Sequence, residues 1–130
     1  MRIAIGIGLL FNLLWGERFE LISADRVYDN ETELLWNTHS SKKSLNFNDA
    51  KSYCKELKLR LPSHSELKSL VDYSKYEPAI ATDLIEVIKD KMYWTSTSYY
   101  HNDTYWTVYF VNGKDLHRQR NTQHYVLCIE

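Results

Sequence analysis

The stretch Asn46-Phe-Asn-Asp-Ala-Lys-Ser-Tyr-Cys-Lys-Glu-Leu57 decides how the chain folds, because its apolar residues recur at intervals of three and four. Asn46 is suited to cap the first turn of a helix, and Asp49 adds a negative charge near the positive end of its dipole. The pattern predicts an amphipathic helix that turns Cys54 toward the core. Its buried face would carry Phe47, Ala50, Tyr53, Cys54 and Leu57.

A second helix is predicted shortly after the first. Pro62 disfavours helical dihedrals at the residue before it and so ends the first helix. Ser63-His-Ser-Glu66 then has the S-x-x-E spacing of a capping box. Residues 78–90 carry spaced apolar side chains and predict a loop that leads into a short third helix. The buried side of the second helix would hold Leu67, Leu70 and Val71.

The remaining segments alternate in the manner of strands. Short strands are expected within residues 19–36, and again at residues 93–99 and 105–111. Asn112-Gly113 is a hairpin signal, because Gly113 can adopt a positive φ. Residues 116–120 are polar and are interpreted as a connection, whereas residues 124–129 predict a closing strand. The core of these strands would include Trp94, Trp106, Val108 and Phe110.

Length and charge exclude several classes of protein. The chain has 130 residues, which suits one domain, and its 16 Lys+Arg and 17 Asp+Glu give a net charge of −1. A nucleic-acid-binding domain normally shows a basic excess, so nucleic acid is not an expected partner. Only four glycines are present, three of them in the first sixteen residues, so no glycine-rich phosphate-binding loop can be formed.

Residues 1–16 are interpreted as a signal peptide or apolar leader. Arg2 is followed by an apolar run from Ile3 to Trp15 that only Asn12 interrupts. Thirteen residues are too few to span a membrane, which takes about twenty, but they match the hydrophobic region of a secretory signal. The alternative is a buried N-terminal strand or helix. On the first interpretation the protein is exported, periplasmic or secreted, with a domain at residues 17–130 and no membrane span after leader removal.

The two cysteines are interpreted in the light of export. In an oxidising compartment an even number of cysteines in a small domain indicates a disulfide. Cys54 and Cys128 are 74 positions apart and lack the spacing of a zinc site. Free buried thiols and reactive thiols are the other interpretations that these residues allow.

Eight short motifs occur in a characteristic order. They are Asn30-x-x-x-x-Leu35-Trp36, Asn48-Asp49-Ala50-x-x-Tyr53-Cys54, Arg60-Leu61-Pro62-Ser63-x-x-Glu66-Leu67, Val71-Asp72-Tyr73, Tyr76-x-Pro78-Ala79-Ile80, residues 93–99, Trp106-x-Val108-x-Phe110-x-Asn112-Gly113 and Tyr125-Val126-x-Cys128. The set resembles a bacterial domain family typified by the C-terminal domain of the Lcl collagen-like adhesin, which looks related in fold to C-type lectins and to formylglycine-generating, sulfatase-modifying enzymes.

This resemblance carries expectations about fold and cofactors. It implies a compact α+β domain with two main helices packed on a small, mostly antiparallel sheet, and a bridge from Cys54 to Cys128. The calcium-binding signature of lectins is missing, because Ala79 stands where an amide ligand would be needed after Glu77-Pro78. Calcium-dependent sugar binding is therefore not inherited, and neither a cofactor nor a metal site is expected.

Catalysis is not expected either. The five histidines are scattered along the sequence, and Ser63 already has a capping role. Sulfatase-modifying relatives use a pair of cysteines that binds copper in an open site. The only two cysteines here fit the structural bridge, so none remains for that chemistry.

Two polar and aromatic segments near the C-terminus are the candidate binding surface. Tyrosine offers a large contact area at a low entropic cost, and Arg and Asn add directional hydrogen bonds. These segments predict an exported, non-catalytic domain that binds a glycan or a protein surface. The alternatives are a structural component of the cell envelope without a soluble ligand, a sulfatase-modifying-like oxidase, or simply a well-packed turn. The candidate residues are Tyr99, Tyr100, His101, Asn102, Asp103, Tyr105, Arg118, Arg120, Asn121 and Gln123.

Overall fold

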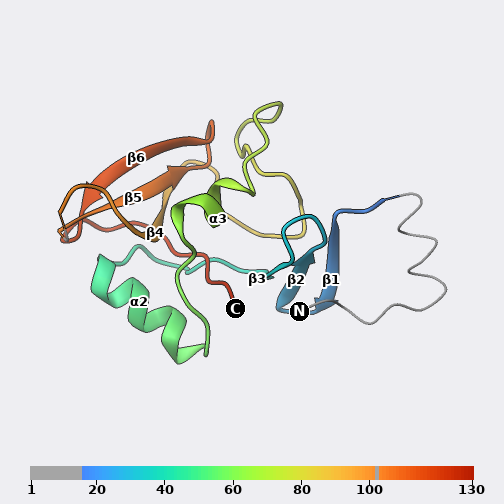
Figure 1. Ribbon diagram of the computed structural model, residues 1–130, viewed down its shortest axis with the longest axis horizontal. Helices are drawn as coiled ribbons and strands as arrows, with labels where there is room; N and C mark the ends of the chain where they lie inside the picture. Colours follow the sequence, from blue (N-terminus) through green and yellow to red (C-terminus); the bar gives the residue numbers. More distant parts are fainter. Residues whose placement is uncertain (1–15, 102) are drawn as a thin grey trace.

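The computed structural model describes residues 16–101 and 103–130 (Figure 1). The leader interpretation therefore falls on residues outside this description, except for Gly16. The described chain has two helices and two three-stranded antiparallel sheets, which confirms the α+β class. In chain order the elements are β1 (Phe19–Ser23), β2 (Arg26–Asp29), β3 (Leu34–Asn37), α2 (Phe47–Glu56), α3 (His64–Lys68), β4 (Met92–Ser98), β5 (Thr104–Tyr109) and β6 (Lys114–Gln119).

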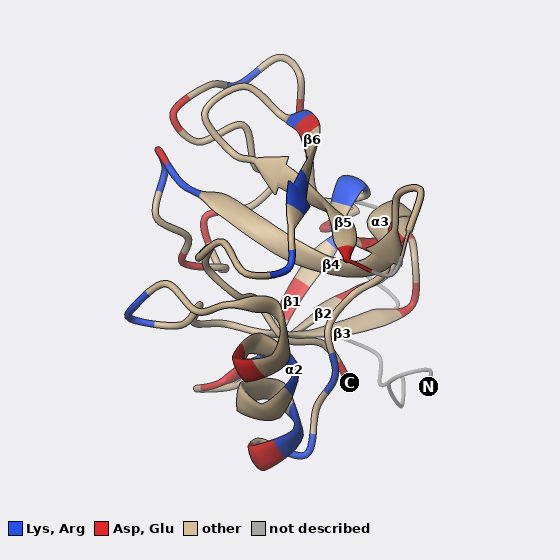
Figure 2. Cartoon of the chain, turned by 90° about the vertical axis from the view of Figure 1, so that its left-hand side faces the viewer, with Lys and Arg blue, Asp and Glu red and all other residues tan. Residues whose placement is uncertain are grey.

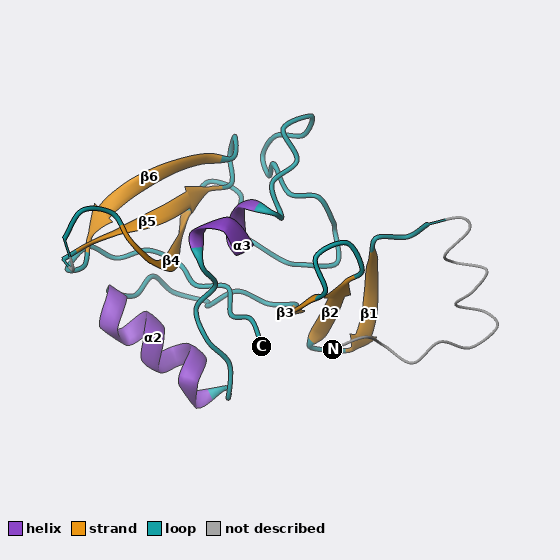
Figure 3. Ribbon diagram, in the orientation of Figure 1, coloured by secondary structure: helices purple, strands orange, loops and turns teal. Residues whose placement is uncertain are grey.

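The strands form two separate sheets instead of the single sheet that was expected. One has the order β1-β2-β3 and the other the order β4-β5-β6, and every neighbouring pair is antiparallel. The two sheets lie toward opposite ends of the domain, with α3 between them and α2 beside the second sheet (Figures 1 and 3). The C-terminal segment runs through the space between the sheets (Figure 1).

Both predicted helix starts are confirmed. The Asn46 side chain accepts a hydrogen bond from the Asp49 amide at 2.9 Å and so caps α2. At α3 the Ser63 hydroxyl accepts from the Glu66 amide at 3.2 Å, and the Glu66 carboxylate accepts from the Ser63 amide at 2.7 Å. Arg60 binds the same carboxylate with two nitrogens, and this hydrogen bonding lowers the pKa of Glu66 to about 2.

The β5–β6 hairpin is also confirmed, with Gly113 at φ +81°. A side chain at Gly113 would collide with Val71, so both the turn and the close approach require glycine here. The polar segment after the turn was expected to be a connection. It forms strand β6 instead. It is an edge strand with both faces partly open to solvent, and so it lacks the apolar alternation that marks a half-buried strand.

Two further expectations are wrong. Residues 78–90 form no helix, because their amides bond to distant carbonyls: Ala79 to Phe110, Ala81 to Leu70 and Glu86 to Thr38. Residues 124–129 are extended but form only isolated bridges, since their hydrogen bonds alternate among several different elements. The closing segment therefore forms hydrogen bonds with both sheets and with Arg60, in the segment between α2 and α3, instead of joining one sheet.

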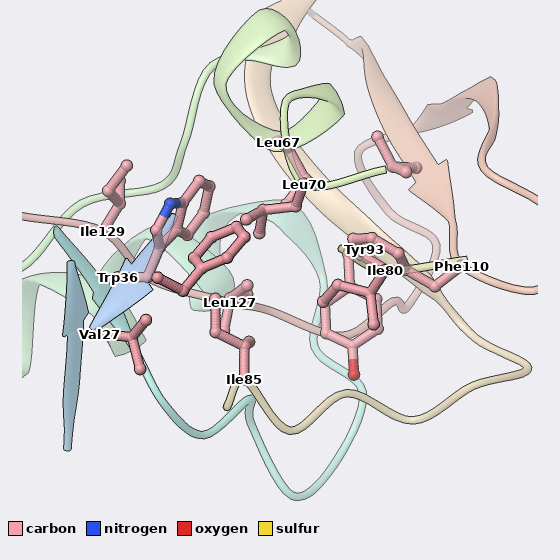
Figure 4. Packing of buried hydrophobic residues seen from close by; sticks show 12 residues of the cluster. Val27, Trp36, Leu67, Leu70, Ile80, Ile85, Tyr93, Phe110, Leu127 and Ile129 are labelled. Atoms are coloured by element: carbon pink, nitrogen blue, oxygen red, sulfur yellow. The ribbon is translucent and has the colours of Figure 1, made fainter. Parts of the chain in front are cut away.

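The core consists of two apolar clusters joined through this closing segment. Figure 4 shows the larger one, in which Trp36 and Val27 of the first sheet meet Leu67 and Leu70. The smaller one packs Phe47, Ala50 and Cys54 of α2 against Trp94 and Val126. The predicted disulfide is present in the smaller cluster: Cys54 and Cys128 are fully buried, with an S–S distance of 2.08 Å and Cα atoms 5.5 Å apart.

Candidate functional site

Three aromatic rings gather where β5 begins and β6 ends. Trp106 and His117 are direct partners in the β5–β6 pairing, so their side chains emerge from the same face of the sheet. Tyr99 follows β4 and is held beside them by a hydrogen bond from its amide to the Thr104 carbonyl oxygen, at 2.9 Å. Its ring stacks on His117 with centroids 4.0 Å apart and meets Trp106 edge-on at 5.0 Å.

Helix α3 supplies a fourth ring. The His64 imidazole stacks on Trp106 with centroids 5.0 Å apart and planes inclined by 10°. The His64 amide donates to Thr97 Oγ1 at 2.9 Å, which fixes the start of α3 to β4. Trp106 is thus covered on one side by His64 while the other two rings approach it edge-on. We call Tyr99, Trp106, His117 and His64 the aromatic cluster.

A carboxylate adjoins the aromatic cluster. Asp115 Oδ2 lies 2.8 Å from His64 Nε2, and Oδ1 lies 3.5 Å from Lys68 Nζ. Burial alone would raise the pKa of Asp115, but its own backbone amide, the Lys68 charge and the His64 hydrogen bond outweigh burial and lower it. Asp115 is therefore ionised at neutral pH and can orient the His64 ring. The arrangement combines exposed rings with a fixed hydrogen-bond acceptor.

The turn after β4 holds the first half of the predicted binding residues. Tyr99 is 49% exposed and Tyr100 is 77% exposed, with their rings 6.4 Å apart. His101 is exposed and meets the Tyr100 ring edge-on at 4.2 Å. Asp103 is exposed, and Asn102 lies outside the described residues. Tyr99, Tyr100 and His101 therefore lie together and extend from the aromatic cluster into solvent.

The second half of the predicted binding residues begins with two side chains on the other face of the sheet. Tyr105 and Arg118 are partners one position away from Trp106 and His117, so their side chains emerge from the opposite face. Tyr105 is partly buried and stacks on Phe47 of α2 with ring centroids 3.6 Å apart. Tyr105 is therefore a packing residue that helps to dock α2.

Three further predicted residues lie in the turn after β6, beside the start of α2. Arg120 Nη2 donates to Asn48 Oδ1 at 2.7 Å, and Gln123 Oε1 accepts from Ser44 Oγ at 3.3 Å. Asn121 is exposed. The β5–β6 pairing thus brings the two predicted loops close in space, but their side chains point to different faces of the sheet.

Comparison with known proteins assigns the family. The model of the Lcl C-terminal domain matches residues 25–130, a span that contains both cysteines and the whole aromatic cluster. The chain belongs to the Lcl C-terminal domain family. Neither the comparison with curated proteins nor that with solved structures found a match. The likeness of this Lcl C-terminal domain to C-type lectins and sulfatase-modifying enzymes stays a prediction.

Two features are absent from residues 16–101 and 103–130. No helix in this part of the Lcl C-terminal domain is long and apolar enough to cross a membrane. Nor do three or more His, Cys, Asp or Glu side chains gather there in a way that could hold a metal ion.

Four members of this site were not among the binding residues predicted from the sequence, and His117 is one of them. Trp106 was assigned to the core, yet it is only partly buried. His64 and Asp115 lie 51 positions apart, and no local pattern relates them. One signal was available: Asp115 and His117 are two positions apart, which is the spacing of side chains on one face of a strand.

His124 makes the stability of this Lcl C-terminal domain depend on pH. Burial, together with the charge of Arg118, lowers the pKa of His124 from 6.5 to about 4. The unfolded chain keeps the ordinary value, so between pH 6.5 and 4 it takes up a proton that the folded chain does not. The part of the stability that depends on His124 is complete above pH 6.5, falls as the pH drops and stops falling near pH 4. We expect the melting temperature to fall by a few degrees across this range.

The variant H124Q tests this expectation. Glutamine can keep the hydrogen bond with Thr122 Oγ1, which lies 2.8 Å from His124 Nε2, but it takes up no proton. Between pH 6.5 and 4.5 its melting temperature should change less than that of the wild type, because the contribution of Glu66 is lost only below about pH 4.5. H101Q, which replaces an exposed histidine, is the control. Parallel profiles for the wild type and H124Q would contradict the assignment.

Proposed function

We propose that this Lcl C-terminal domain is an exported, non-catalytic recognition domain that binds a glycan or a protein surface at the aromatic cluster and Tyr100. The observation that carries the proposal is a set of stacked rings that remains open to solvent beside an ionised carboxylate. A glycan is the ligand that this arrangement suits best.

The fixed geometry of the rings supports recognition. Tyr99 is held by His117, and Trp106 is held by His64, so these rings lose little freedom when a ligand covers them. The C–H faces of a pyranose pack well on aromatic rings, and the Asp115 carboxylate can accept hydrogen bonds from sugar hydroxyls. Large exposed aromatic surfaces are also unusual on a domain that binds nothing.

The state of the cysteines supports the exported and non-catalytic parts of the proposal. The sequence has two cysteines, and both belong to the buried disulfide. Such a bond persists in oxidising compartments outside the cytosol. It also leaves no thiolate as a nucleophile or as a copper ligand of the sulfatase-modifying type.

A glycan array followed by titration of the strongest ligand tests the function. The double variant Y99A/Y100A removes two exposed rings and should weaken binding by about tenfold or more. Y73A/Y76A is the matched control, because these tyrosines are 70% and 71% exposed but lie in a different loop. It should bind as the wild type does.

Two results would reject this site. Equal losses of affinity in both double variants would show that exposed tyrosines anywhere on the surface, and not those of the aromatic cluster, hold the ligand. A silent array, together with co-purification of the domain in a fixed envelope assembly, would instead favour a structural component.

A further inference from the structure

A second surface, which shares no residue with the aromatic cluster, lies between one face of α2 and Ser96 of β4. One face of this helix and the segment that follows it line a groove of about 590 Å³. The volume lies within the range of known ligand sites. We call this hollow the α2 groove. Its lining residues are Asn48, Lys51, Ser52, Lys55, Leu59, Arg60, Leu61 and Ser96.

The α2 groove is cationic. Lys51 and Lys55 come from the helix, and no carboxylate is among the lining residues. Neither lysine makes an ion pair with any described residue, although Lys51 Nζ lies 5.7 Å from the centroid of the Phe47 ring. Arg60 is different, because Glu66 already neutralises its guanidinium. The charge available to a ligand is therefore that of two ammonium groups.

The spacing of these ammonium groups defines the ligand further. Lys51 and Lys55 are four residues apart on a helix, which separates them by about 6 Å along its axis. In an extended peptide, alternate side chains lie on one side about 6.6 Å apart. Two acidic residues in alternate positions of a peptide can therefore each meet one lysine. Both signs of charge lie on the α2 ribbon (Figure 2), but Asp49 and Glu56 do not line the groove.

The rest of the lining favours a peptide over a polyanion. Leu59 and Leu61 belong to the smaller core cluster, at 9% and 5% exposed, and present a small apolar edge to the groove, which an apolar side chain would cover. The hydroxyls of Ser52 and Ser96 can pair with peptide backbone groups. Sulfated polysaccharides and nucleic acids lack apolar side chains, and they spread their charge along a longer basic track than two lysines provide.

We propose that the α2 groove binds an acidic peptide segment of a partner protein. The carboxylates of the peptide pair with Lys51 and Lys55, and an apolar side chain of the peptide covers Leu59 and Leu61. The interaction weakens with added salt, because both lysines are exposed.

Fluorescence anisotropy on the full chain tests the proposal. The probe is a fluorescein-labelled heptapeptide in which four leucines alternate with three glutamates. We expect saturable binding that weakens about tenfold or more when glutamine replaces the glutamates, or in the variant K51Q/K55Q. K42Q/K43Q removes the same charge from two exposed loop lysines and should bind within about twofold of the wild type.

A second variant tests the site by shape instead of charge. S52Y fills the α2 groove and leaves both lysines in place, so it should also abolish binding. Circular dichroism melting checks that each variant is folded. The proposal is overturned if the glutamine peptide binds equally well, if K42Q/K43Q loses as much as K51Q/K55Q, or if S52Y binds normally. It is also overturned if a heparin hexasaccharide binds through Lys51 and Lys55 while the acidic peptide does not.

Discussion

Replacement of both cysteines, in the variant C54A/C128A, should lower the free energy of unfolding by about 4 kcal/mol. The bond closes a loop of 74 residues, and in the chain-entropy account the unfolded chain regains that freedom when the bond is removed. For a domain of this size the loss corresponds to a fall in melting temperature of about 15 °C. Denaturant titration gives the first quantity and thermal unfolding gives the second.

Chemical reduction supplies the control for this variant. Wild-type protein unfolded and refolded with a thiol reductant should melt close to C54A/C128A, whereas the variant itself should not respond to the reductant. Both sulfur atoms are fully buried, so the native protein should resist mild reductant and alkylation. A variant that melts within a few degrees of the wild type would show that the bond adds little, and that the two apolar clusters alone hold α2.

The sequence was most informative where local rules act alone. The caps of α2 and α3 involve residues three positions apart, and the positive φ at Gly113 is a property of one residue. Such features need no tertiary context. The disulfide could be predicted because only two cysteines exist and the helical period turns Cys54 inward.

The failures arose where distant partners decide the conformation. Residues 78–90 contain apolar side chains at helix-like intervals, but tertiary hydrogen bonds such as that from Ala81 to Leu70 hold the backbone in bends and turns instead of a helix. In the closing segment every side chain from Val126 to Ile129 is buried, so no periodic pattern could show that its hydrogen bonds go to several elements. No local rule contains this information.

The candidate site was predicted in part for the same reason. Tyr99 and Tyr100 were chosen because tyrosines crowd one turn, and the structure places Tyr99 beside Trp106 and Tyr100 next to Tyr99. The sequence could not show which of Trp106 and Tyr105 belongs to the site, because neighbouring residues of a strand point to opposite faces and either face could be the covered one. Which face of that strand is covered depends on the docking of α2 against Phe47.

The ion pair between Arg18 and Asp29 should have an effect on stability of similar size to that of the disulfide. The Asp29 side chain is fully buried, and its oxygens accept two hydrogen bonds from Arg18, each at 2.8 Å. Arg18 also donates to the Ser69 carbonyl oxygen at 2.9 Å and so ties the first sheet to the end of α3. Burial alone would raise the pKa of Asp29, but the bonds from Arg18, Thr32 and the Glu31 amide lower it.

The variant R18A should therefore lose about 3 to 5 kcal/mol of unfolding free energy, because it leaves a buried carboxylate without its countercharge. The double variant R18A/D29N should recover part of this loss, since it removes the unpaired charge. The asparagine oxygen can still accept from the Glu31 amide, and its NH2 group can donate to the Thr32 hydroxyl instead of accepting from it. Denaturant titration of the wild type, both single variants and the double variant gives the coupling energy of the pair.

A second arginine serves as the control that distinguishes the loss of the buried ion pair from the loss of a positive charge at the surface. Arg26 lies 3.5 Å from the exposed carboxylate of Asp25, so R26A should cost no more than about 1 kcal/mol. R18A should also destabilise the protein more at pH 7 than at acidic pH, because protonation of Asp29 in the variant removes the unpaired charge. If R18A costs no more than R26A, neither contact of Arg18 joins the first sheet to α3. If R18A is costly but D29N fails to rescue it, the loss comes from the Ser69 contact and not from the buried pair.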